Sequence, residues 1–506
     1  MKENLKADGV RVRFAPSPTG NLHIGGVRTA FFNYIFALKY GGEFILRIDD
    51  TDRARSKKEY ESEIIKDLNW FGIKYGGFYR QSERTEVYEK YLEVLKEKDL
   101  IYECFCTEKE ILISKEIAVK SKKPYIYNGR CANLSISEKE KLSSQFKERG
   151  IYPSIRLNIA KVLKAGGNFK AVEFEDAVHG LLSFNPKLIG DFILKTEHNR
   201  FTYNFASIID DHDIGITHVI RGEDHISNTP KQILILNALD KTPPVFAHIS
   251  LLYGKDGKIM SKRDAASNIE YYKKEGYLPE AILNYLAVTG NTFTVLKFEN
   301  GKEKISEKEI FSDILEMAEL FDIKKVRGSS AIFSEEKLRH INEKWLQSIK
   351  AERLIKILIE KFNSEETLKK LQESYGETVF VEIIDFLKNE FKTVKEILAE
   401  IKIFFEDVKI EAAEIKYDIK LKETLLNNLQ KIESDKFDEN AIKNAVKESV
   451  SESGKTLKDC YETLRFCITG RPDGPSILKI IKFMGRERTL KRLYGGAIIG
   501  SVKKIS

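Results

Sequence analysis

The pattern of apolar and polar positions at the N-terminus predicts a strand, a helix and a second strand. Apolar residues alternate with polar ones over Val10–Phe14, and a Pro- and Gly-rich turn follows at 16–20. A helix is expected next, with Asn21 as its N-cap and the apolar run 30–38 as its buried face. After two glycines, Glu43–Ile48 has the composition of a buried strand. These elements predict a β-α-β unit.

The middle of the chain departs from this pattern and then returns to it. Helical apolar stripes fill 56–100, but from Ile101 short strand-like pieces such as Ile155–Ile159 and Val172–Phe174 alternate with basic helical stretches. A further buried strand is expected at Thr217–Ile220. The pattern therefore predicts an α/β module inserted between two halves of one α/β domain.

The C-terminal part is expected to be almost wholly helical beyond Ser267. Pro279 stands at a position that the first turn of a helix tolerates, and Leu354, Ile357 and Leu358 recur at the spacing of one buried helical face. Strand patterns are nearly missing after residue 350. We therefore expect a multidomain chain that ends in an array of amphipathic helices.

Composition narrows the class of protein. With 506 residues and 42% apolar residues, the chain is long enough for several packed cores. Its 84 basic and 77 acidic side chains give a net charge of +7, which is compatible with a polyanionic partner. No apolar run reaches the roughly 18 residues that span a membrane, and five unevenly spaced cysteines do not form a disulfide framework. A cytoplasmic protein is expected.

Candidate chemistry lies at the carboxyl edge of the predicted β-α-β unit. Glycines 25 and 26 at the helix start would let a nucleotide approach the backbone, and His23 would donate to a phosphate oxygen. On their own these four residues, His-Ile-Gly-Gly, are more often a Gly-rich helix start with a surface histidine. A second basic loop at 254–264 contains Lys262 and is suited to fold over a triphosphate.

Taken together, these segments resemble the paired signatures of class I aminoacyl-tRNA synthetases. His-Ile-Gly-Gly at 23–26 follows Ala-Pro-Ser-Pro-Thr-Gly, and Met-Ser-Lys-Arg at 260–263 lies far downstream. Arg-Ile-Asp-Asp-Thr-Asp at 47–52 and Val-Ile-Arg-Gly-Glu-Asp at 219–224 are similar to the bacterial glutamyl branch. The resemblance implies an α/β Rossmann-like class I synthetase catalytic domain with an inserted α/β domain, followed by an all-α C-terminal anticodon-binding domain.

The resemblance also implies domain boundaries and a reaction. Five segments are expected, namely the first half of the catalytic domain (1–100), an inserted acceptor-stem-binding domain (101–202), the second half of the catalytic domain (203–254), a stem-contact domain (255–340) and a helical anticodon-binding domain (341–506). The implied reaction joins L-glutamate to tRNA(Glu) with ATP through a glutamyl-adenylate. The implied partners are tRNA, ATP and glutamate, with no membrane, and the chain is expected to be a monomer.

A glutamate substrate has two carboxylates and one ammonium group, so a selective site needs two cationic forks and an anion. The resemblance assigns these roles to Arg13, Arg221 and Asp49, with hydroxyl groups from Ser17 and Tyr203 refining the fit. Read from composition alone, each arginine would be a surface ion pair and the tyrosine a buried ring. Which arginine takes the side-chain carboxylate is left open.

ATP is expected to contact both signatures. The resemblance implies that the catalytic groups are His23, Lys262 and Arg263, and that ATP binds His23, Gly25, Gly26, Ser261 and Lys262, with Mg²⁺ bridging the phosphates. The chain departs from the family pattern at three positions. Gly26 replaces a second histidine, Ile259 replaces the first lysine of the second signature, and Asp49 is one methylene shorter than the usual glutamate.

Three cysteines in the inserted segment have a spacing typical of metal ligands. Cys104, Cys106 and Cys131 predict a structural Zn²⁺ site, because a cytosolic chain rarely clusters three thiols. By resemblance Tyr127 is the fourth ligand, and a water or a carboxylate such as Glu103 is the alternative. The competing interpretation is a degenerate site with three reduced cysteines.

Two other functions fit parts of the sequence. A glutaminyl-tRNA synthetase shares the catalytic signatures, but it carries β-barrels where this chain is helical. A catalytically silent tRNA-binding paralogue would have no reason to keep Met-Ser-Lys-Arg at 260–263. The sequence therefore favours a glutamate-tRNA ligase.

Overall fold

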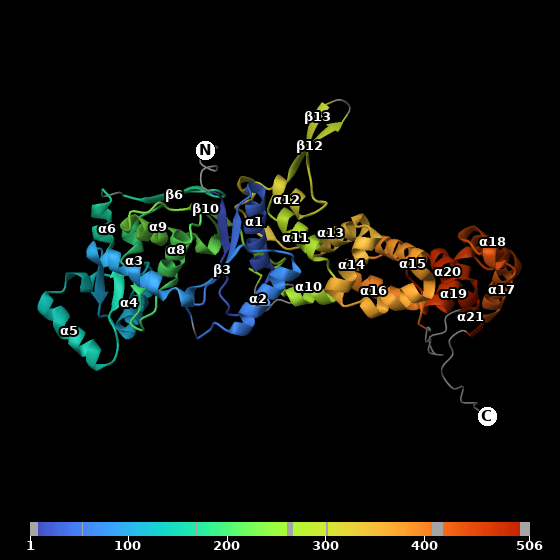
Figure 1. The fold of residues 1–506 in the computed structure, drawn as a ribbon, viewed down its shortest axis with the longest axis horizontal. Helices are drawn as coiled ribbons and strands as arrows, with labels where there is room; N and C mark the ends of the chain where they lie inside the picture. The colour runs from blue at the N-terminus through green and yellow to red at the C-terminus, as the bar shows by residue number, and fades with distance from the viewer. Residues whose placement is uncertain are drawn as a thin grey trace. The chain divides into compact units, whose positions relative to one another are not determined.

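The computed structural model describes residues 9–52, 54–167, 170–260, 267–299, 302–406 and 418–495 (Figure 1). The chain divides into two compact units, Met1–Tyr272 with Pro279–Leu338 and Lys273–Leu278 with Arg339–Ser506. No helix among the described residues is long and apolar enough to cross a membrane.

A seven-stranded sheet forms the centre of the first unit, in the order β3-β2-β1-β9-β10-β6-β7. All neighbours pair in parallel except β6 and β7, which form an antiparallel hairpin. The strand bounds are β1 Arg11–Phe14, β2 Glu43–Ile48, β3 Gly77–Arg80, β6 Val172–Asp176, β7 Gly180–Phe184, β9 His218–Gly222 and β10 Val245–Ile249. Because the chain runs outward from β1 in one direction and from β9 in the other, the strand order reverses between these two strands, where α/β folds place their ligands.

Helix α1 (Ile24–Tyr40) connects β1 and β2, as the pattern predicted. It is apolar on most of its circumference, and Val27, Phe31 and Ile35 are fully buried. Gly41 ends the helix with φ of 61°, a backbone conformation that favours glycine. The helix thereby fixes its N-terminus at the carboxyl edge of the sheet.

Helices α3, α8 and α9 pack together in one apolar core. Tyr88 and Leu92 of one helix and Phe205 and Ile209 of another belong to that core. The bounds are α2 Lys58–Trp70, η1 Gln81–Glu83, α3 Thr85–Glu97, α8 Tyr203–Asp213, η3 Glu223–Asn228 and α9 Thr229–Ala238. The strand β3 was not predicted, since the sequence pattern gave only helical stripes over 56–100.

A second, three-stranded antiparallel sheet lies in the segment predicted as an insertion. Its order is β4-β5-β8, with bounds Ile101–Cys104, Ser154–Leu157 and Ile193–Lys195. Short helices accompany it, namely α4 Glu108–Lys120, η2 Arg130–Asn133, α5 Ile136–Glu148, α6 Ile159–Ala165 and α7 Pro186–Ile189. The hairpin β6–β7 lies between β5 and β8 in sequence, yet it extends the central sheet. Residues 172–184 thus belong structurally to the central seven-stranded sheet.

The expectation that the chain beyond Ser267 is almost wholly helical is wrong for one segment. Strands β12 (Thr294–Glu299) and β13 (Lys302–Glu307) pair as an antiparallel hairpin that extends away from α11 and α12 in Figure 1. The remaining elements of this region are α10 Ile269–Glu275, α11 Pro279–Val288, α12 Ile314–Leu320, η5 Ile323–Lys325 and the pair β11 Leu252–Tyr253 with β14 Ala331–Ile332.

The second unit is helical throughout its described residues. In α14 the predicted stripe Leu354, Ile357 and Leu358 is buried, which confirms the amphipathic pattern. The bounds are α13 Glu335–Ser348, α14 Ala351–Phe362, α15 Glu365–Glu390, α16 Val394–Ile401, η6 Lys402–Phe404, α17 Ile419–Gln430, η8 Ser434–Lys436, α18 Glu439–Ser453, α19 Leu457–Thr469, α20 Ile477–Met484 and α21 Arg486–Gly495. Glycine 376 has a non-helical backbone and marks a kink within α15.

Candidate active site

A cavity lies at the carboxyl edge of the central sheet, between the ends of β1, β9 and β10. Six of the residues predicted from the sequence line it, and they come from β1, the start of α1, the start of α8 and the end of β9. They are Arg13, His23, Gly25, Gly26, Tyr203 and Arg221. Segments that are far apart in sequence therefore meet at one place.

Two predicted substrate residues do not line this cavity. Ser17 is exposed in the turn after β1, and Asp49 is buried at the end of β2. The backbone N–H of Asp49 donates to the carbonyl of Pro16 at 3.0 Å, so the two segments lie against each other. Ser261, Lys262 and Arg263 lie outside the described residues, whereas Ile259 and Met260 just before them line the cavity.

His23 is the N-cap of α1, so the prediction that Asn21 caps this helix is wrong. The backbone of His23 is extended, and its Nδ1 accepts a hydrogen bond from the N–H of Gly26 at 3.2 Å. Since Nδ1 accepts, the neutral ring carries its proton on Nε2. The imidazole can then donate from Nε2, which is the chemistry expected of a group that contacts phosphate.

The two glycines of the first signature lie close to neighbouring side chains. A Cβ on Gly25 would lie 3.1 Å from the His23 ring, and a Cβ on Gly26 would lie 2.7 Å from Cδ1 of Leu22. Side chains at these positions would displace the capping histidine or its neighbour. The glycines therefore keep the helix start narrow beside the cavity.

Arg221 is a buried guanidinium with only neutral hydrogen-bond partners. Its Nε donates to Nε2 of His248 at 3.1 Å, and its Nη2 donates to Thr229 and Gln232 at 2.8 Å each. Its Nη1 is buried and makes no hydrogen bond with any described residue. Burial lowers the pKa of Arg221, and the Tyr203 hydroxyl opposes this shift. A buried cation of this kind favours an anionic ligand in the cavity it lines.

Arg13 differs from Arg221 because it already has a carboxylate partner. Its Nε and Nη2 donate to the two oxygens of Asp211 at 3.0 and 3.3 Å, and both side chains are buried. The guanidinium cations beside Asp211 hold the pKa of that carboxyl below its usual value, against the effect of burial. Arg13 is thereby held in place at the cavity wall.

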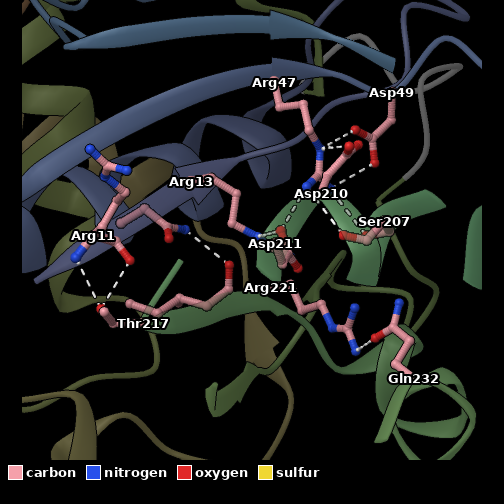
Figure 2. A network of polar contacts seen from close by, with 12 residues as sticks. Arg11, Arg13, Arg47, Asp49, Ser207, Asp210, Asp211, Thr217, Arg221 and Gln232 are labelled. Carbon is pink, nitrogen blue, oxygen red and sulfur yellow. Dashed lines mark hydrogen bonds and ion pairs between the residues drawn. The ribbon is translucent and has the colours of Figure 1, made fainter. Parts of the chain in front are cut away.

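Arg47 organises a buried ionic network that the sequence analysis missed. Figure 2 shows its guanidinium directed toward the carboxylates of Asp49 and Asp210. The Nε donates to Asp49 at 2.7 Å, and Nη1 donates to Asp211 at 2.6 Å. Burial raises the pKa of Asp49 to about 6, although the charge of Arg47 opposes this shift. The carboxylate proposed for substrate is thus already engaged in this conformation.

The cavity wall carries an excess of positive charge. Arg13, Arg28 and Arg221 line it, and Asp224 is the carboxylate among its described lining residues. Arg28 donates to the backbone carbonyls of Ser250 and, at 3.0 Å, Thr289, and burial lowers its pKa to about 10. An anionic substrate would complement this wall.

Cys104 at the end of β4, Cys106 just after it and Cys131 in η2 form a compact cluster. Their three Sγ atoms all lie within 4.8 Å of one another, and no other described group of metal-ligating side chains of this kind is present. The hydroxyl of Tyr127 lies 3.5 Å from Sγ of Cys104 and 3.3 Å from Sγ of Cys106. Hydrogen bonds from Cys106 and Cys131 hold the pKa of the Cys104 thiol far below its usual value. The donor set fits the ligands and spacing that a tetrahedral zinc ion needs, and Glu103 is not part of it.

Comparison with known proteins agrees with this geometry. Residues 9–340 match the family of class I tRNA synthetases (E and Q), catalytic domain, and residues 350–497 match an anticodon binding domain. A glutamate–tRNA ligase of Bacillus pumilus is 36% identical over 501 residues, which cover 96% of this chain and 99% of that protein. A glutamate–tRNA ligase of Caldicellulosiruptor saccharolyticus is 39% identical, with 96% and 98% covered.

The chain belongs to the glutamate–tRNA ligase family. A solved structure of the same family, a glutamate tRNA ligase from Elizabethkingia meningosepticum in complex with its amino acid, matches with a TM-score of 0.77 and 30% identity. The match covers 97% of this chain and 99% of the Elizabethkingia meningosepticum chain. As a member of the glutamate–tRNA ligase family, the chain is an aminoacyl-tRNA ligase with a Rossmann-like catalytic domain and a helical anticodon-binding domain.

Proposed function

We propose that this chain joins L-glutamate to tRNA(Glu) in two steps within the described cavity. In the first step a glutamate carboxylate oxygen attacks the α-phosphorus of ATP, and pyrophosphate leaves. In the second step a hydroxyl of the tRNA 3′ ribose attacks the carbonyl carbon of the glutamyl-adenylate, and AMP leaves. Steps of this kind depend mainly on positioning and charge stabilisation by the protein.

The observation that carries the proposal is the buried guanidinium of Arg221. Its side chain lines the cavity with one N–H pair that no described residue satisfies. Arg13 has Asp211 as its partner, so Arg221 has the greater need of a substrate carboxylate. We therefore assign one carboxylate of glutamate to Arg221 and the other to Arg13, with Arg221 as the stronger ligand.

Tyr203, Asp49 and Ser17 are proposed to complete glutamate recognition. The hydroxyl of Tyr203 lies 3.1 Å from Nδ1 of His225, so it is held at the cavity wall. Asp49 would receive the ammonium group when its carboxylate turns from Arg47 toward the cavity.

ATP is proposed to lie against the start of α1. His23 would donate from Nε2 to a phosphate oxygen, and the absence of side chains at Gly25 and Gly26 would admit the adenosine. Ser261, Lys262 and Arg263 would add positive charge and a hydroxyl group to the phosphates. Mg²⁺ would arrive bound to ATP and neutralise its phosphate charge.

Zn²⁺ is proposed as a structural ion at Cys104, Cys106 and Cys131, with Tyr127 as the fourth ligand. The short distances from the Tyr127 hydroxyl to two of the sulfur atoms support this assignment. The ion would stabilise the small second sheet and take no part in the reaction.

The domain roles are also proposals. Within 101–202, the residues around the second sheet would contact the acceptor stem, residues 255–340 would contact the stem, and 341–506 would hold the anticodon arm of tRNA(Glu). The monomeric state and the cytoplasmic location stay predictions from the sequence.

The test is pyrophosphate exchange into ATP with glutamate, measured with and without tRNA(Glu). Exchange that depends on glutamate is expected in at least one of these conditions. Exchange with glutamine but not glutamate would overturn the assignment in favour of a glutaminyl-tRNA synthetase. No exchange with either amino acid, by protein that still binds tRNA, would indicate a catalytically silent paralogue.

A further inference from the structure

Behind Arg221, on the side away from the cavity, lies a buried pair formed by Asp176 and His248. Nδ1 of His248 lies 2.6 Å from Oδ2 of Asp176, and neither side chain has exposed surface. His248 belongs to β10, and Asp176 is the last residue of β6. The two side chains and Arg221 therefore form a chain of contacts that ends at the cavity.

The contact with Arg221 fixes the tautomer of His248. An arginine Nε–H can only donate, so Nε2 of His248, 3.1 Å away, must accept. The proton of the neutral ring is then on Nδ1, where it is donated to Asp176. Burial lowers the pKa of His248, which keeps the ring neutral beside the guanidinium.

The carboxylate of Asp176 meets hydrogen-bond donors on both of its oxygens. Oδ1 accepts from the backbone N–H groups of Val178 and His179 at 3.0 Å each. Oδ2 accepts from the backbone N–H of His248 at 3.1 Å as well as from its imidazole. This arrangement requires an acceptor at both oxygen positions, which only a carboxylate supplies.

We propose that Asp176 and His248 are positioning residues for glutamate recognition. They hold an acceptor lone pair against Nε of Arg221, and this contact, together with the hydrogen bonds of Nη2 to Thr229 and Gln232, sets the direction of Nη1. The inference rests on the proposed role of Arg221 as a ligand of a glutamate carboxylate. It assigns a specificity role to a strand, β6, that lies within the segment predicted as an acceptor-stem domain.

The decisive substitution is Asp176→Asn, which removes one acceptor and adds two donors. If the amide nitrogen faces the imidazole, the ring must move its proton to Nε2, which then meets the Nε–H of Arg221 donor to donor. If it faces the other way, it meets the backbone N–H groups of Val178 and His179. The KM for glutamate should rise about tenfold or more, whereas kcat and the KM for ATP should change less than about twofold.

Glu175→Gln is the matched control, because it makes the same change of charge at an exposed neighbour on the same strand. Both variants are assayed as full-length protein by glutamylation of tRNA(Glu), together with their melting temperatures. A glutamate KM equal to that of Glu175→Gln would overturn the inference. A fall in kcat together with equal rises in the KM values for glutamate and ATP would also overturn it, because this result would indicate a general disturbance of the structure.

A second pair of variants keeps the test decisive if Asp176→Asn does not fold. His248→Gln can present an oxygen to Arg221 and a nitrogen to Asp176, whereas His248→Leu can present neither. The glutamate KM should be closer to the wild-type value in the glutamine variant, and equal values in the two variants would contradict the inference. A wild-type protein that does not use glutamate would instead refute the proposed function, which separates the two failures.

Discussion

Replacing Arg221 by glutamine should abolish most of the affinity for glutamate without weakening the fold. The guanidinium is buried, and in the free protein it forms no ion pair with a described carboxylate. Truncating one partner of a buried ion pair costs about 3–5 kcal/mol, because the other charge is left uncompensated. At about 1.4 kcal/mol per factor of ten, the KM for glutamate should rise by roughly two to three and a half powers of ten.

The stability of the fold, unlike the affinity for glutamate, should not decrease in Arg221→Gln. Arg221→Gln removes three hydrogen bonds of the guanidinium, each worth about 0.5–1.5 kcal/mol. It also removes a buried charge whose desolvation costs several kcal/mol. The melting temperature of the free protein should therefore not fall, so a loss of glutamate affinity cannot be attributed to unfolding.

The assay is the initial rate of tRNA(Glu) glutamylation as a function of glutamate concentration, with ATP saturating. Arg353→Gln, the same substitution at an exposed position of α14, is the control and should leave the KM for glutamate unchanged. A KM for Arg221→Gln within a factor of three of the wild-type value would exclude Arg221 as a ligand of a glutamate carboxylate. A large fall in melting temperature with equal rises in the KM values for ATP and glutamate would exclude this role of Arg221 as well.

Three further predictions follow from the proposed site. Lys262→Ala should slow adenylate formation by on the order of a hundredfold or more and leave tRNA affinity nearly intact, because fixed charge acts mainly on the transition state. Pre-steady-state rates and tRNA titration measure the two quantities, and an equal loss of tRNA binding would contradict the prediction. The KM for glutamate should rise as the pH falls through about 6, because Asp49 becomes protonated and loses the charge that attracts the ammonium group. This rise should be missing in Asp49→Asn. A wild-type KM that is flat from pH 7 to 5 would exclude Asp49 as the partner of the ammonium group. Protein purified without added zinc should contain about one equivalent of Zn²⁺, and Cys104→Ser and Tyr127→Phe should lower this content. A content well under one equivalent that Cys104→Ser does not change would rule out the zinc site. Full zinc content in Tyr127→Phe would rule out only Tyr127 as a ligand.

Local patterns were sufficient to predict the framework of the site. The period of two over Val10–Phe14 and the apolar run after it correspond to β1 and α1, and the predicted strand Glu43–Ile48 is confirmed. His23 and Arg221 could be placed at the cavity because each lies at the end of such an element. The cysteine spacing likewise predicted a cluster that the structure brings together.

The contacts that position these groups depend on long-range pairing, which no local pattern contains. Arg47 near the carboxyl end of β2 looks like an exposed strand residue, yet it is fully buried, and Asp210 and Asp211 of α8 pair with it. Asp176 and His248 meet only because β6 joins β10 in the central sheet. Polar residues in strands can therefore be assigned to the interior only after the topology is known.

The most direct test of the account identifies the amino acid that the protein attaches to tRNA. Total tRNA is charged with ATP in an equimolar mixture of glutamate and glutamine, digested with ribonuclease, and the aminoacyl-adenosine is identified by mass spectrometry. We expect glutamyl-adenosine from the wild-type protein and a strongly reduced amount from Arg221→Gln. Glutaminyl-adenosine as the main product, or glutamyl-adenosine at the same level from both proteins, would contradict this expectation.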